Sequence, residues 1–141
     1  MTIADRVILA FGNWFSEETV RRSLAKRAME ECFLFGLDVN RSWGAPVGTF
    51  RSDFYILPFK GRIEIAIRPS IAPEQIRSFA RAYAGKDYLC VLFVSNQAPD
   101  ELLIQDAFKQ KVLLVFGSKP KEIAHWLKEK ANESRCGSWP N

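Results

Sequence analysis

The run YLCVLFVS at residues 88–95 decides the fold that we predict for this chain, because it is apolar throughout. A strand of that composition is typical of a parallel sheet that is covered by helices on both faces. A second apolar run, VLLVFGS at residues 112–118, follows the segment APDELLIQDAFKQ, which has the pattern of a crossover helix. We therefore predict that the two runs form adjacent parallel strands.

Amphipathic patterns predict three further helices outside this pair. They cover residues 119–131, residues 72–85, where Pro73 stands in the first turn, and residues 16–36, where Gly36 can end the helix. Their apolar residues recur at helical spacing, so each helix can cover one face of a sheet.

The remaining strands are predicted in RSDFYILPFKGRIEIAIRPS, residues 51–70, which has the pattern of an antiparallel hairpin that turns around PFKG. The order is then helix, two or three antiparallel strands, helix, strand, helix, strand, helix. This order predicts an α/β fold with a mixed β-sheet flanked by helices. We expect a single domain over residues 1–132 and a flexible C-terminal tail over residues 133–141.

Composition and cysteine usage narrow the class of protein. The chain has 141 residues, of which 48% are hydrophobic and 26% charged, as is ordinary for a globular domain. No apolar run approaches the roughly 20 residues that cross a bilayer, and the first residues have no basic leader or cleavage site. We therefore expect a cytoplasmic protein with no membrane partner. The three cysteines are odd in number and far apart, which argues against a disulfide framework or a cysteine metal site.

Positive charge is distributed unevenly along the chain. The net charge is +4, and ten of the eleven arginines precede residue 85, whereas seven of the nine lysines follow it. Because arginine binds phosphate with two parallel hydrogen bonds, we expect any phosphate-contacting face to lie in the first 84 residues. The candidate nucleic-acid-binding side chains are Arg62, Arg68, Arg77, Arg81 and Trp43, of which the last could stack on a base.

The hairpin carries two acidic residues, Asp53 at the start of its first strand and Glu64 within its second. With these residues in place, the order of elements over residues 17–118 resembles the restriction endonuclease-like, or PD-(D/E)xK, superfamily. The phrase IAPEQIRSFARAYAGKDYLCVLF is similar to archaeal Holliday junction resolvases. The resemblance implies a restriction endonuclease-like fold and a nucleic-acid ligand, with DNA as the first expectation.

The resemblance also implies a metal-dependent active site. In the superfamily, an Asp that opens one strand, a Glu in the next strand and a Glu on the first helix surround a divalent metal. The matching residues are Asp53, Glu64 and Glu18 (or Glu17), all candidate catalytic residues, with Asp53 and Glu64 as ligands of Mg²⁺ or Mn²⁺. Such a metal would stabilise charge on the phosphodiester and supply a deprotonated water.

Two departures from the family pattern leave the function open. Ala66 stands where the family has a lysine, and Ser52 stands where a proline is usual. One hypothesis is a metal-dependent nuclease; the other is an inactive module of the same fold that binds nucleic acid or a protein, and a homodimer also stays open. Independently of the resemblance, Asp53 and Glu64 could belong to a solvated strand face.

The register of the hairpin distinguishes these interpretations. A four-residue PFKG loop places Tyr55 opposite Glu64 and makes Asp53 a diagonal neighbour of Glu64, with Cα atoms about 7 to 8 Å apart. A three-residue loop turns Asp53 to the opposite face. A two-residue loop separates the carboxylates by roughly 13 Å along the strands. Only the first register allows one metal to bridge them.

Overall fold

The computed structural model describes residues 23–42 and 50–133. It contains a five-stranded sheet in which the spatial order of the strands follows their order in the chain. The strands are β1 (Val39–Arg41), β2 (Phe54–Ile56), β3 (Arg62–Arg68), β4 (Tyr88–Val94) and β5 (Val112–Phe116). The first three pair antiparallel and the last three pair parallel, so the predicted α/β fold with a mixed sheet is confirmed.

The parallel half of the sheet forms as its sequence predicts. β4 and β5 are adjacent and parallel, with Cys90 opposite Val112. The crossover between them is α3 (Glu101–Lys109), and α2 (Pro73–Ala82) makes the equivalent crossover from β3 to β4. The prediction of two adjacent parallel strands is therefore confirmed.

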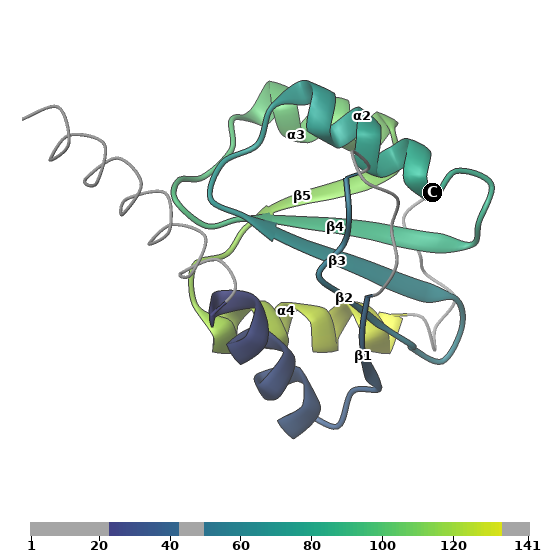
Figure 1. Ribbon diagram of the computed structural model, residues 1–141, viewed down its shortest axis with the longest axis vertical. Coiled ribbons are helices and arrows are strands. Elements are labelled where there is room, and N and C mark those ends of the chain that lie inside the picture. The colour runs from purple at the N-terminus through teal and green to yellow at the C-terminus, as the bar shows by residue number, and fades with distance from the viewer. Residues whose placement is uncertain (1–22, 43–49, 134–141) are drawn as a thin grey trace, which may run out of the picture.

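Helices cover both faces of the sheet (Figure 1). α2 and α3 lie on one face, and α4 (Pro120–Glu133) lies on the other beside a helix over residues 23–34. The side chains of β3 divide accordingly. Ile63, Ile65 and Ile67 belong to the core beneath α4, whereas Ala66 belongs to the core beneath α2.

Local signals explain where several helices begin and end. Pro73 starts α2, and the Asp100 side chain caps α3 by accepting a hydrogen bond from the Leu103 amide at 3.0 Å. The helix over residues 23–34 is followed by Gly36, whose φ of 82° favours glycine. The predicted start of that helix, at Ser16, lies outside the described residues.

The hairpin adopts the register of the four-residue loop. Tyr55 pairs with Glu64, and Phe54 pairs with Ile65. Of the three registers allowed by the sequence, this is the one that keeps Asp53 and Glu64 near each other.

None of the helices in residues 23–42 and 50–133 is long and apolar enough to cross a membrane. α4 extends to Glu133, and the rest of the predicted tail lies outside the described residues.

Candidate functional site

Glu64 is fully buried, with 0% of its surface exposed. Its Oε1 atom accepts a hydrogen bond from Arg62 Nε at 2.6 Å, and its Oε2 atom accepts one from Ser52 Oγ at 2.5 Å. The interpretation of this residue as part of a solvated strand face is therefore wrong. The alternation in RIEIAIR places Glu64 on the more polar face of β3, but α2 covers that face.

Ser52 is the centre of a buried polar network. Its single hydroxyl proton is donated to Glu64, so the hydroxyls of Ser42 (2.8 Å) and Tyr83 (3.0 Å) must donate to its oxygen. The network is complete, because no buried side-chain nitrogen or oxygen in the described part of the chain lacks a partner. The Ser52 hydroxyl thus supplies a hydrogen bond that a proline, the residue expected here from the resemblance, could not supply.

Asp53 completes the edge of the sheet where β2 leaves β3. Its amide donates to the Ile65 carbonyl at 2.8 Å, and its Oδ2 atom accepts from the Ile67 amide at 2.8 Å. The Asp53 carboxylate therefore accepts the hydrogen bond from the Ile67 amide that a backbone carbonyl would accept if the β2–β3 pairing continued. Oδ2 also forms an ion pair with Arg68 Nη1 at 2.9 Å.

The two arginines of β3 are held within the protein. The Arg62 guanidinium lies 3.5 Å from the centroid of the Tyr55 ring and 4.8 Å from that of Tyr88. Arg68 donates to Asp53, to the Ile67 carbonyl at 2.9 Å and to the Arg51 carbonyl at 2.7 Å. Neither arginine is presented as an open phosphate contact.

The described carboxylates do not fit a Mg²⁺ or Mn²⁺ site. Both oxygens of Glu64 are bonded to Arg62 and Ser52, and Asp53 Oδ2 is bonded to a backbone amide and a guanidinium. Within residues 23–42 and 50–133, no group of three or more His, Cys, Asp and Glu side chains could hold a metal ion. Ala66, which the resemblance matches to a lysine, is fully buried in the core.

Two of the predicted functional residues lie outside the described residues. These are Glu18, the expected third carboxylate, and Trp43, the expected stacking residue. Their roles stay predictions.

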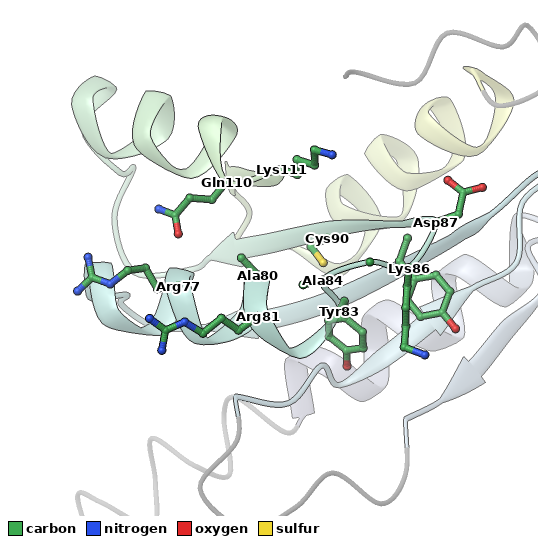
Figure 2. Close-up of a pocket in the computed structure, with 12 residues that line it drawn as sticks. Arg77, Ala80, Arg81, Tyr83, Ala84, Lys86, Asp87, Cys90, Gln110 and Lys111 are labelled. Carbon is green, nitrogen blue, oxygen red and sulfur yellow. The ribbon is translucent and has the colours of Figure 1, made fainter.

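A cleft of about 650 Å³ opens beside this network, between the carboxyl end of α2 and the turn that precedes β5. Two of the predicted arginines, Arg77 and Arg81, line it together with Lys86 and Lys111. Figure 2 shows the two arginines extending from α2, with Lys111 across the cleft. Asp87 is the one acidic residue among those that line it.

Of the residues that line this cleft, the sequence interpretation assigned only Arg77 and Arg81 to a site, and it missed the basic residues Lys86 and Lys111. The two lysines follow residue 85, in the part of the chain where no phosphate contact was expected. Each lies in or next to a turn that leads into a parallel strand, β4 or β5. Because the amino ends of adjacent parallel strands meet at one edge of the sheet, that placement was the available signal.

The buried network reaches the wall of the cleft through Tyr83 and Cys90, which both line it. Burial raises the pKa of Tyr83, and burial together with the charge of Glu64 raises the pKa of Cys90 to about 12. The thiol is therefore protonated at neutral pH and is a poor nucleophile. Four of the residues that line the cleft are cationic: Arg77, Arg81, Lys86 and Lys111.

Comparison with known proteins does not assign this chain to a family. No family profile matches the chain, and neither a curated protein nor a solved structure is found that matches it.

Proposed function

We propose that this chain is a nucleic-acid-binding module of restriction endonuclease-like fold that holds its ligand without cleaving it. The observation that carries the proposal is the cleft that is lined by Arg77, Arg81, Lys86 and Lys111. Four basic side chains with one acidic neighbour favour a ligand with several phosphates, because each phosphate neutralised releases bound counterions.

The order of elements supports the fold assignment. A helix, three antiparallel strands, a helix and a parallel strand follow one another, as the resemblance to the superfamily implies. The state of Asp53 and Glu64 supports the absence of cleavage. Each carboxylate is paired with an arginine, and neither has the neighbouring lysine of the family motif.

Fluorescence anisotropy with labelled DNA and RNA oligonucleotides at several salt concentrations tests the binding. The Arg77→Ala/Arg81→Ala variant should bind more weakly, and the slope of log K against log salt should fall by roughly 1.4 to 1.8 for two lost phosphate contacts. The matched control is Lys119→Ala/Lys121→Ala, which removes two charges from exposed positions at the start of α4, on the other face of the sheet. Equal losses in both variants would refute the cleft as the binding site.

The second candidate function is metal-dependent cleavage, favoured by the hairpin register that keeps Asp53 and Glu64 near each other. Calorimetry with Mn²⁺ distinguishes the two functions. A nuclease should bind the ion with roughly millimolar or better affinity, and Asp53→Ala should abolish that binding. The proposed binding module should show no binding that depends on Asp53, and it should leave labelled DNA and RNA intact in Mg²⁺ and in Mn²⁺.

A further inference from the structure

We infer that the cleft takes single-stranded rather than double-stranded nucleic acid, with a base on its floor and the phosphates at its rim. This inference rests on the proposed function and specifies the ligand of the same site. It draws on three separate features: the shape of the cleft, the nature of its floor and the backbone conformation of Lys111.

The shape of the cleft disfavours a duplex. A duplex has a convex surface, and proteins reach its bases with elements that protrude into a groove about 12 Å wide. Here the basic side chains surround a recess of about 650 Å³ at the carboxyl end of α2. That volume lies within the range of roughly 300 to 1,000 Å³ typical of pockets that enclose a small organic molecule. It can therefore accept a nucleotide that projects from a flexible strand.

Besides its four basic residues, the cleft has apolar and aromatic lining residues, which we call its floor. They are Ala80, Ala84, Cys90, Tyr83 and Tyr88, and the centroids of the two tyrosine rings are 5.9 Å apart. The hydroxyl of Tyr83 is already bonded to Ser52, so its ring is fixed in place. An apolar, aromatic floor beneath a basic rim matches a ligand with a flat base and an attached phosphate.

Lys111 supplies an independent observation at this site. Its φ is 66°, and it is the one residue other than glycine with positive φ in residues 23–42 and 50–133. The equivalent turn before β4 has Gly85, with a φ of 78°. Glycine adopts this conformation without the steric cost that a lysine incurs. A strained lysine at the mouth of a basic cleft indicates that the charge itself is useful there.

Because Lys111 has a positive φ, it can be replaced by glycine without loss of stability. That variant tests the effect of the lysine on binding separately from its effect on folding. Lys111→Gly removes the charge and relieves the backbone, so the melting temperature should stay equal or rise while affinity for a single strand falls several-fold. The salt slope for a single strand should fall by about 0.7, the value for one phosphate contact. Lys111→Asn, which also tolerates positive φ, is the second variant if the glycine lowers the melting temperature. Lys121→Ala is the charge control.

The experiment compares four probes by anisotropy or competition: a single-stranded oligothymidylate, a duplex of the same length, an abasic deoxyribose-phosphate strand of the same length and thymidine monophosphate. We expect the single strand to bind at least about tenfold more tightly than the duplex. The abasic strand should bind roughly 5- to 150-fold more weakly than the oligothymidylate, the range for loss of one base–aromatic stack.

The other outcomes overturn different statements. Equal or tighter duplex binding would overturn the single-strand inference and leave the proposed function standing, whereas no binding of any strand would refute both. Abasic and normal strands of equal affinity would show that charge alone is recognised and would overturn the role of the floor. A mononucleotide that binds as tightly as the oligomer would identify a free nucleotide as the ligand. Unchanged affinity in both Lys111 variants would remove that residue from the site.

Discussion

Replacement of Glu64 by alanine should destabilise the protein by about 3 kcal/mol, because its carboxylate holds a buried network together. Removal of one partner of a buried ion pair costs about 3 to 5 kcal/mol. The lower figure applies here because the Arg62 side chain is 28% exposed and keeps its contacts with Tyr55 and Tyr88. The lost acceptor of Ser52 Oγ, worth about 1 kcal/mol, is part of that total. For a chain of this size, about 3 kcal/mol corresponds to a fall of roughly 10 °C in melting temperature.

Urea unfolding followed by far-ultraviolet circular dichroism measures this change. Glu64→Gln should lose less than the alanine variant, because it keeps the volume and can still bond Ser52. The matched control is Glu122→Ala, which removes an exposed acid that pairs with the exposed Lys119 and should change stability by about 0.5 kcal/mol or less. A Glu64→Ala variant as stable as the parent, or more stable, would refute the structural role. It would indicate a carboxylate retained for binding at a cost in stability.

Three further predictions concern the core. Ala66→Lys should lower stability by about 3 kcal/mol or more in urea unfolding and confer no Mg²⁺-dependent cleavage, since the position is fully buried; DNA cleavage by a folded variant would contradict this. Gly117→Ala should cost about 1 to 3 kcal/mol, because the added Cβ would lie 2.7 Å from Phe93 Cδ1; an unchanged melting temperature would show that the ring can move. Burial raises the pKa of Cys32 and of Cys90 from 9.0 to about 12, so the folded state keeps thiol protons that the unfolded chain loses. Stability should therefore fall as pH rises from about 9 towards 12, and Cys32→Ala/Cys90→Ala should flatten that decline; an identical decline in the double variant would argue against it.

The sheet could be predicted from the sequence because its signals are local. The apolar runs at residues 88–95 and 112–118, and the segment between them, were sufficient to predict two parallel strands with a crossover helix. The hairpin was also predicted, but the sequence around PFKG is compatible with loops of four, three or two residues. The choice among them depends on how β2 and β3 pack, which a single sequence does not contain.

The site was harder to predict because it depends on contacts between distant parts of the chain. Glu64 has the alternation expected of a half-exposed strand, but the face of β3 on which it lies is covered by α2, since Ala66 on that face packs with Ile76 and Phe79. The spacing of Tyr83 along the sequence places it on the core side of the helix. The same spacing does not reveal that its hydroxyl bonds Ser52 and so completes the network. The lysines of the cleft meet the arginines of α2 only after the parallel strands have formed. Residue spacing predicts which side chains share one face of a helix or strand. The cleft is instead formed by the end of α2 and the turns before β4 and β5, which are distant in the sequence.

The order of the strands in the sheet bears on how the chain folds as it leaves the ribosome. Because each strand pairs with the one that precedes it in the sequence, every new strand can add to the free edge of a sheet that already exists. None has to be inserted between two strands that are already paired, which keeps the sequence separation of contacts short and favours fast folding. The cost falls on the face with Ile63, Ile65 and Ile67, which is covered only when α4, the last of the described elements, has been synthesised. Until then the growing chain exposes an apolar surface, so this is the stage at which aggregation would compete with folding.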